Sequence, residues 1–326
     1  MTKEQLPGSS YLPNEVTPET PVEVNAAKIA REMEPQVAGL KPQDVLHADK
    51  VFVVGQIGYD FGTEARLDYF TQVMGGKASH PFDPVHMATH LLEGDNIEQS
   101  NAMTWTLKID GIPVYAIEPE NQFVVLQYQQ LVNFLYDQEK NGVERISIAG
   151  TVIGETRLFN GQIVPTIAPV LRGMFNWRSR DLATAVMSAA SVRDIGTQGS
   201  KSNNLPDVAS SQSQSEAIKS FLDRVYYELR NRGSSSSERA LNYAATNAYQ
   251  MSEVFCDALE QNLFLNKISA VESPVSRPDS DCWDVVLEFF NPKERLTSAR
   301  KLYRYTIDVS DIMPVTVGEL RSWHAY

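Results

Sequence analysis

Residues 102–120, AMTWTLKIDGIPVYAIEPE, contain two β-rich runs on either side of Asp110-Gly111. An Asp-Gly pair between two such runs is the strongest short-range signal for a β-hairpin with a two-residue turn. A second pair of runs, TRLFNGQIVPTIAP at residues 156–169, turns at Asn160-Gly161. These two hairpins predict antiparallel β-structure in this part of the chain.

The sequence before the first hairpin predicts one strand and two helices. The apolar, β-branched run KVFVVGQIGYDF (residues 50–61) predicts the strand, and GTEARLDYFTQVM (62–74) predicts a helix capped by Thr63. DPVHMATHLLEG (83–94) predicts a second helix that begins at Pro84 and stops at the glycine.

The segment between the hairpins, residues 121–142, is predicted to be a helix that closes at Asn141-Gly142. Its apolar side chains recur at helical spacing. The predicted buried face consists of Phe123, Leu126, Leu131, Phe134 and Leu135.

The C-terminal third predicts helices at residues 215–233 and 236–263, followed by a run of strands. The β-rich runs lie at 264–275, 282–290, 301–310 and 314–323. Two helices followed by a strand meander indicate an α+β domain with antiparallel pairing, and not a doubly wound sheet. For the whole chain we therefore predict two mixed subdomains, each with an antiparallel sheet.

Composition shifts divide the chain into four parts. Residues 1–48 mix Pro, Glu, Thr and Gly with few aromatics, which predicts a flexible N-terminal arm. Residues 191–215 are rich in Ser, Gln, Asn and Gly, which is typical of a linker. The two subdomains are then residues 49–190 and 216–326.

Charge and hydropathy exclude two classes of partner. The formal net charge of −12 opposes attraction to phosphates, so nucleic acid is disfavoured. No apolar run approaches the roughly 20 residues of a membrane-spanning helix. The first residues lack the pattern of a secretory signal, and only Cys256 and Cys282 are present, so we expect a cytoplasmic protein with reduced thiols.

Three histidines lie close together in HPFDPVHMATH, at positions 80, 86 and 90. On a helix, His86 and His90 would share a face, and His80 or Asp83 could supply a third ligand for a divalent metal. Met87 stands where the zincin motif requires a glutamate, so hydrolysis by that mechanism has no support. The alternative is an exposed helix face without any cofactor.

Residues 273–290, SPVSRPDSDCWDVVLEFF, gather charged and reactive side chains before an apolar run. The cluster is either a site or the corner of a hairpin. The thiol has no obvious base, and the preceding aspartate would raise its pKa, so a structural thiol is favoured over a nucleophile. The candidate residues are Arg277, Asp279, Asp281, Cys282, Trp283 and Asp284.

The helix SSERALNYAATNAYQ carries Arg239 and Asn242 at i, i+3 spacing. Together they could hydrogen-bond a peptide backbone or a carboxylate. In the alternative, an alanine face (Ala240, Ala244 and Ala248) packs on the sheet, while Arg239 pairs with an aspartate of the 273–290 cluster.

Several of these stretches resemble the C-terminal region of the cyanobactin maturation protease family PatA/PatG. They are VFVVGQIGYDFGTEARLDYF, WTLKIDGIPVYAIEP, ERALNYAATNAYQ and SPVSRPDSDCWDVVLEFFNP with the following YRYTIDVSDIMPVTVGELRSW. The resemblance runs from about Lys50 to the end of the chain. It implies an accessory module of unknown function, built of paired segments near 50–175 and 215–326.

In that family the module stands behind a subtilisin-like protease, whose serine, histidine and aspartate motifs we do not find here. Peptidase activity is therefore not transferred, and whether the chain is an enzyme stays open. The family often has a cysteine where this chain has Ser276, so a paired-cysteine site with Cys282 is broken.

The resemblance implies a non-catalytic accessory or binding protein of ribosomal peptide biosynthesis. Its expected partners are precursor peptides or peptide-modifying enzymes, with an extended peptide added at an open sheet edge or met at the Arg277, Asp279 and Trp283 corner. The alternatives are a metal-dependent enzyme or metal-stabilised module at the three histidines, and a general protein-interaction module. Self-association through sheet edges is also possible.

Overall fold

The computed structural model describes residues 49–77, 79–178, 230–246, 263–291 and 299–325, with single positions at 181, 184, 227, 254, 258 and 261. The elements below all belong to the unit Ala48–Tyr326. The arm predicted at 1–48 and the linker predicted at 191–215 lie outside the described residues. No described helix is long and apolar enough to cross a membrane.

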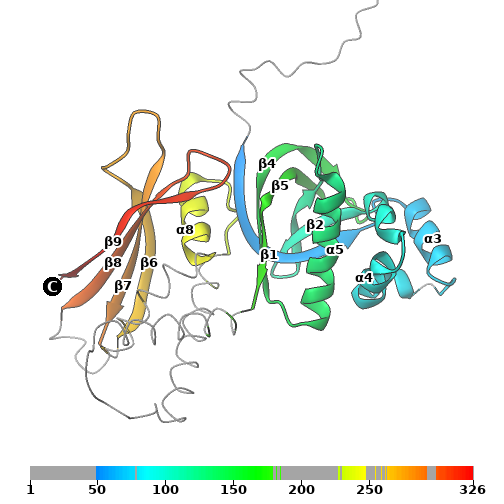
Figure 1. Ribbon diagram of the computed structural model, residues 1–326, viewed down its shortest axis with the longest axis horizontal. Coiled ribbons are helices and arrows are strands. Elements are labelled where there is room, and N and C mark those ends of the chain that lie inside the picture. Colours follow the sequence, from blue (N-terminus) through cyan, green and yellow to red (C-terminus); the bar gives the residue numbers. More distant parts are fainter. Residues whose placement is uncertain are drawn as a thin grey trace, which may run out of the picture. The chain divides into compact units, whose positions relative to one another are not determined.

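Five strands form a closed barrel in the order β1-β2-β3-β5-β4 (Figure 1). Both predicted hairpins are confirmed. β2 and β3 are antiparallel around Asp110 and Gly111, whose φ values of 51° and 80° fit a turn that needs two positive φ angles. β4 and β5 are antiparallel around Gly161, with φ of 88°. The strands are β1 (Lys50–Asp60), β2 (Thr104–Ile109), β3 (Ile112–Ile117), β4 (Arg145–Arg157) and β5 (Ile163–Trp177).

The predicted α+β class with antiparallel sheets is confirmed, and one seam of the barrel adds a parallel pair of strands. β3 and β5 are parallel, paired through Ala116 with Thr166 and Ile117 with Ile167. β1 closes the circle by antiparallel pairing with both β2 and β4. A turn signal specifies only the two strands that it joins, so it could not predict pairing between strands far apart in sequence.

In the sequence, helices lie between β1 and β2 and between β3 and β4. Thr63 caps α3, accepting the Arg66 N–H at 3.4 Å, and Asp83 caps α4, which begins at Pro84 as predicted. The helical elements of this part are α3 (Glu64–Val73), η1 (His80–Phe82), α4 (Pro84–Leu92), η2 (Asn96–Ala102) and α5 (Val124–Lys140).

The predicted buried face of α5 is right for Leu131, Phe134 and Leu135 and wrong for Phe123 and Leu126, which are 45% and 51% exposed. Gln127 is buried in their place and donates a hydrogen bond to the Pro169 carbonyl at 2.6 Å. Gln127 lies four, seven and eight residues before Leu131, Phe134 and Leu135, so the buried side chains share one face of the helix. A polar side chain with a buried partner thus completes the stripe.

The C-terminal part is an antiparallel meander in the order β6-β7-β8-β9, preceded by α8 (Ser236–Thr246). This confirms the predicted order of helix and strands, whereas the predicted helix at 215–233 lies mostly outside the described residues. The strands are β6 (Phe264–Glu272), β7 (Cys282–Phe290), β8 (Arg300–Asp308) and β9 (Val315–Ala325).

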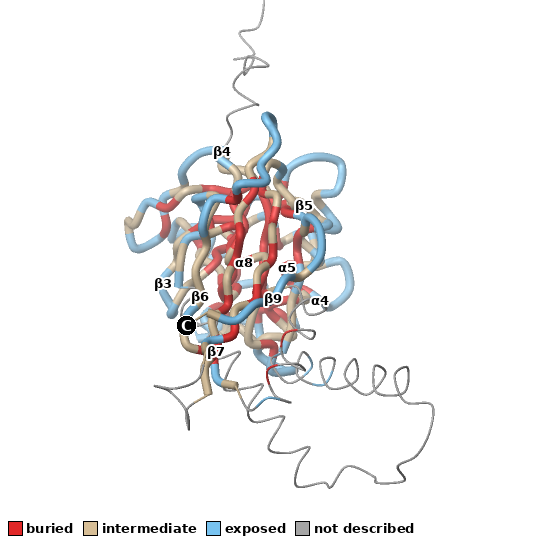
Figure 2. The backbone as a smooth tube through the Cα atoms, turned by 90° about the vertical axis from the view of Figure 1, so that its left-hand side faces the viewer, coloured by how far each residue is buried: buried red, intermediate tan, exposed pale blue. Residues whose placement is uncertain are grey.

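Each sheet has its own buried core. In the barrel the core includes Trp105, Leu107 and Ile148, all without exposed surface. In the meander, α8 packs Ala240 and Ala244 against the sheet, as predicted for its alanine face. Figure 2 shows the burial along the middle lengths of the strands, with exposure at the connecting loops.

Candidate functional site

The stretch around Arg277 is the connection between β6 and β7. The Ser273 N–H donates to the Cys282 carbonyl at 2.9 Å, and the Ser280 N–H donates to the Arg277 carbonyl at 3.0 Å. Arg277 and Asp279 are exposed on this loop. The prediction that this stretch forms the corner of a hairpin is therefore confirmed. Recognition of a peptide or a partner protein by the exposed Arg277 and Asp279 stays a prediction.

Asp281 is the centre of a hydrogen-bond network inside this corner. Its carboxylate accepts the Trp283 indole N–H at 2.7 Å and the Ser236 hydroxyl. Arg239 lies 3.9 Å away with its side chain 7% exposed, which confirms the predicted pairing with an aspartate. Burial lowers the pKa of Arg239, and the Asp281 charge opposes that shift.

Asn242 binds the chain's own backbone. Its Nδ2 donates to the Phe52 carbonyl of β1 at 2.8 Å and to Asn231 Oδ1 at 2.9 Å. The Phe52 N–H in turn donates to the Gly233 carbonyl at 2.9 Å. Asn242 therefore bonds α8 to the barrel, and neither it nor Arg239 presents its polar atoms to a peptide in this structure.

Cys282 and Asp284 are buried behind the loop. Asp284 accepts the Thr306 hydroxyl at 2.7 Å and pairs with Arg304 at 3.2 Å. The Cys282 N–H donates to Ser276 Oγ at 3.2 Å, so the serine that replaces the family's cysteine lies against Cys282. The burial of Cys282 fits the structural thiol.

The three histidines make polar contacts to three different residues, Met74, Asp83 and Gln99. The rings of His80 and His86 stack at 4.7 Å, and His86 Nδ1 lies 2.7 Å from Asp83 Oδ2, a contact that lowers the pKa of Asp83. His90 Nε2 instead lies 2.9 Å from Gln99 Oε1. In the described ranges no group of three or more His, Cys, Asp or Glu is placed to hold a metal ion. Metal binding at this segment stays a prediction.

A hollow that the sequence reasoning missed lies on the barrel beside β1, with a volume of about 400 Å³. We call it the aromatic hollow. Its polar lining includes Gln56, Asp60, Lys108 and Glu139. Its apolar lining residues are Ile57, Phe61, Phe82, Pro84, Leu135 and Phe159.

Two aromatic side chains on this hollow are exposed to solvent. Phe82 is 60% exposed and Phe159 is 43% exposed. Phe82 packs edge-to-face on Phe61 at 5.7 Å, and Asp60 Oδ1 accepts the Phe159 N–H at 2.8 Å. The Phe82 ring is thus held by Phe61, the residue that follows β1, and the Phe159 backbone is held by Asp60 at the end of β1.

Several polar groups in the wall of the hollow have hydrogen-bond partners within the chain. The Gln138 side chain bonds both backbone groups of Ile57, accepting at 2.9 Å and donating at 3.2 Å. The Tyr59 hydroxyl donates to the Pro81 carbonyl at 2.7 Å. Burial raises the pKa of Tyr59, with a smaller contribution from the Asp83 and Glu139 carboxylates, so this hydroxyl stays protonated.

Lys108 crosses β1 at Gly58. A Cβ at position 58 would lie 2.3 Å from Lys108 Cε and 2.5 Å from Nζ, so the flexible end of the Lys108 side chain occupies the space beside this glycine. Gly55 likewise lets β2 approach closely, because its Cβ would meet the Lys108 carbonyl at 2.4 Å. The two glycines inside an otherwise apolar strand were the sequence signal for this close approach.

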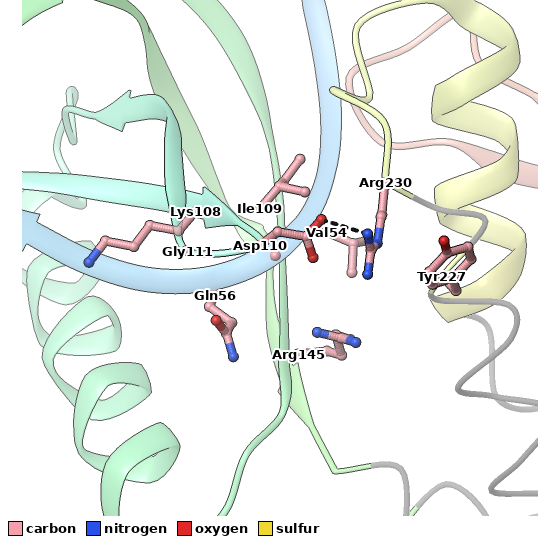
Figure 3. Close-up of a pocket in the computed structure, with 10 residues that line it drawn as sticks. Val54, Gln56, Lys108, Ile109, Asp110, Gly111, Arg145, Tyr227 and Arg230 are labelled. Atoms are coloured by element: carbon pink, nitrogen blue, oxygen red, sulfur yellow. Dashed lines mark ion pairs between the residues drawn. The ribbon is translucent and has the colours of Figure 1, made fainter. Parts of the chain in front are cut away.

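A second hollow of about 280 Å³ shares Gln56, Lys108 and Gly111 with the first, and we call it the basic hollow. Figure 3 shows the Asp110–Arg230 ion pair, 3.2 Å between Arg230 Nη1 and Asp110 Oδ2, on one side and the Lys108 ammonium pointing to the other. The remaining lining residues are Val54, Gly55, Ile109, Arg145 and Tyr227. The first hollow is thus lined by aromatic, aliphatic and charged side chains, and the second has Lys108, Arg145, Arg230 and Asp110 among its lining residues.

Comparisons with known proteins match two long segments of the chain to one family of domains. A family model described as PatG Domain matches residues 50–158, and one described as PatG C-terminal matches residues 208–323. A solved structure entitled "PatG Domain of Unknown Function" is 32% identical, with a TM-score of 0.72, over 85% of this chain and 99% of that one. No curated protein matches the chain.

Proposed function

This chain belongs to the PatG family, and from that premise we propose that it is a non-catalytic accessory protein of ribosomal peptide biosynthesis of the cyanobactin type. In this proposal it acts in the cytoplasm and binds a precursor peptide or a peptide-modifying enzyme. The family name supports the pathway, and the contacts within the chain lead us to place the proposed binding site elsewhere than at the polar residues singled out in the sequence. Arg239, Asn242, Asp281 and Asp284 all engage partners within the chain.

The observation that carries the proposal is the aromatic hollow. Ligand sites are concave and mostly apolar, with a few polar groups that fix orientation. This hollow has the required size, and it keeps Phe82 and Phe159 exposed where a ligand would cover them. Burying an aromatic side chain contributes about 1.5–3 kcal/mol, so two such rings favour an apolar side chain of a peptide.

The sheet edge offers a second mode of contact. Among the described strands β9 pairs only with β8, and Val315, Val317 and Trp323 on it are 40–53% exposed. An extended peptide could add to this edge through main-chain hydrogen bonds. Gly318, with φ of 78°, interrupts the strand, which limits the length of regular pairing.

The test is a quantitative pull-down of the tag-free protein with a panel of cyanobactin-type precursor peptides and modifying enzymes. We expect one partner to bind, and the double variant Phe82→Ala/Phe159→Ala to weaken it at least about tenfold, since each ring contributes burial. The matched control is Phe123→Ala/Val125→Ala, which removes two exposed apolar side chains at the start of α5 that line neither hollow.

Two results would count against the proposal. Failure of the wild-type protein to bind any member of the panel would remove the accessory function. Equal binding by the Phe82→Ala/Phe159→Ala variant would move the site away from the aromatic hollow. Metal content assayed on the same sample tests the alternative at the histidines, which predicts about one metal ion per chain.

A further inference from the structure

β1 changes its neighbouring strand halfway along its length. Residues 50–55 pair with β4, and residues 56–60 pair with β2. The two neighbours lie on opposite edges of β1, so each half of the strand has one edge without a strand beside it. The backbone groups of successive residues point alternately to the two edges, so every second residue presents its N–H and C=O to the open edge.

The chain itself fills the open edge of the first half. The Phe52 N–H donates to the Gly233 carbonyl at 2.9 Å, and the Phe52 carbonyl accepts the Asn242 side-chain amide at 2.8 Å. A main-chain carbonyl and a side-chain amide from another part of the fold thus satisfy this edge where no strand pairs with it.

The open edge of the second half is filled at Ile57 but not at Tyr59. Gln138 of α5 accepts the Ile57 N–H at 2.9 Å and donates to the Ile57 carbonyl at 3.2 Å, as a residue of a neighbouring strand would. Tyr59 is two residues further along β1, so its N–H and C=O point to the same edge. Neither group has a hydrogen-bond partner in the part of the chain that the structure describes, where the Tyr59 hydroxyl bonds Pro81.

This open edge lies at the aromatic hollow. Ile57, Tyr59 and Gln138 line the hollow together with the exposed Phe82 and Phe159. A ligand there meets apolar side chains and an unpaired main-chain donor and acceptor. The backbone of an extended peptide carries the complementary acceptor and donor at every second residue.

We propose that an extended peptide segment adds to β1 at Tyr59, as a short strand that continues from Gln138. One residue of the peptide accepts the Tyr59 N–H and donates its own N–H to the Tyr59 carbonyl, as in an antiparallel pair. Apolar side chains of the peptide contact the rings of the aromatic hollow. The inference rests on the proposed function and adds to it how the backbone of the peptide is held. The ligand class is an apolar segment in extended conformation, with no need for a free terminus.

The experiment follows amide hydrogen exchange by NMR in the presence of a synthetic octapeptide of alternating serine and leucine that ends in leucine. In an extended peptide of this sequence the leucines share one face. Saturating peptide should slow the exchange of the Tyr59 amide at least about tenfold, because this amide gains an acceptor. The Phe52 and Ile57 amides already have acceptors and should exchange as they do in the free protein.

Two N-methylated isomers of the octapeptide test the backbone of the ligand. One carries methyl groups on the amides of two inner leucines and the other on the amides of two inner serines, so each isomer lacks donors on one edge only. Calorimetric titration should show one isomer binding at least about tenfold more weakly than the parent peptide, because the Tyr59 carbonyl loses its donor. The other isomer should bind like the parent.

Gln138→Ala opens the edge of β1 at Ile57 as well. In this variant the octapeptide should protect the amides of both Ile57 and Tyr59. The matched control is Gln129→Ala, which removes an exposed glutamine of α5 that lines neither hollow and should behave as wild type. Circular dichroism of both variants checks that they are folded.

The outcomes distinguish the inference from the function on which it rests. If the octapeptide shifts the signals of Phe82 and Phe159 while the Tyr59 amide exchanges as before, strand addition is overturned and the peptide-binding function stands. Equal binding of the two methylated isomers would also overturn strand addition. So would a failure of the octapeptide to bind at millimolar concentration, because main-chain pairing tolerates changes of sequence, and the pull-down panel tests the function separately.

Discussion

At the scale of single residues, Asn242 links two parts of the fold through one side-chain amide. It is fully buried and donates to the Phe52 carbonyl, which lies in β1. Asn242→Ala leaves that carbonyl without this donor, so we expect the free energy of unfolding to fall by about 1–3 kcal/mol.

Urea denaturation measures this loss, with Asn101→Ala as the matched control. Asn101 is exposed, and its replacement should change stability by no more than about 0.5 kcal/mol. If the two variants unfold at the same urea concentration, the bond between α8 and β1 contributes nothing.

The contact between His86 and Asp83 gives a pH-dependent prediction. The hydrogen bond from His86 is the main cause that lowers the pKa of Asp83. A lowered folded-state pKa means that the stabilisation is present above the unfolded pKa of about 3.9 and is lost as pH falls through the folded value. His86→Ala should therefore raise the Asp83 pKa toward its ordinary value, which an NMR titration of the carboxyl carbon measures. An unchanged titration would assign the shift to the helix cap alone.

At the scale of elements, the glycines of β1 control how closely β2 can pair. Gly55→Ala forces a methyl group against the Lys108 carbonyl at 2.4 Å, so the strands must separate. We expect a loss of about 1–3 kcal/mol in thermal or urea unfolding, as for overpacked sites. Gly154→Ala in β4 meets no atom within 4 Å and serves as the control, with stability equal to or above wild type. Equal stability of the two variants would refute the close approach.

Elements with local signals were predictable from the sequence. Thr63, Asp83 and Pro84 fix helix starts through contacts with their own first turns, and Asp110-Gly111 fixes a turn through its backbone angles. The parallel seam between β3 and β5 was not predictable, because nothing near Ala116 identifies Thr166 as its partner. The buried stripe of α5 was missed at Gln127, since its hydrogen-bond partner Pro169 lies 42 residues away in the sequence.

At the scale of the whole molecule, the difference between contacts of sequence neighbours and contacts of distant residues explains which parts of the site the sequence could indicate. The corner residues are neighbours in sequence, and the pairing of Arg239 with an aspartate was predicted from charge. The aromatic hollow assembles Ile57, Phe82, Lys108 and Phe159 from four separate elements or turns. Each of these residues is ordinary in its own segment, so only the closed barrel brings them together.

The most direct test of the account is an NMR titration of the protein with a synthetic octapeptide that ends in leucine, following assigned side-chain and backbone signals. Binding at the aromatic hollow predicts shifts at Phe82, Phe159 and Lys108, with no change at the exposed Phe123, which precedes α5. Shifts confined to β9, or no shifts at millimolar peptide, would contradict the claim that this hollow is the binding site.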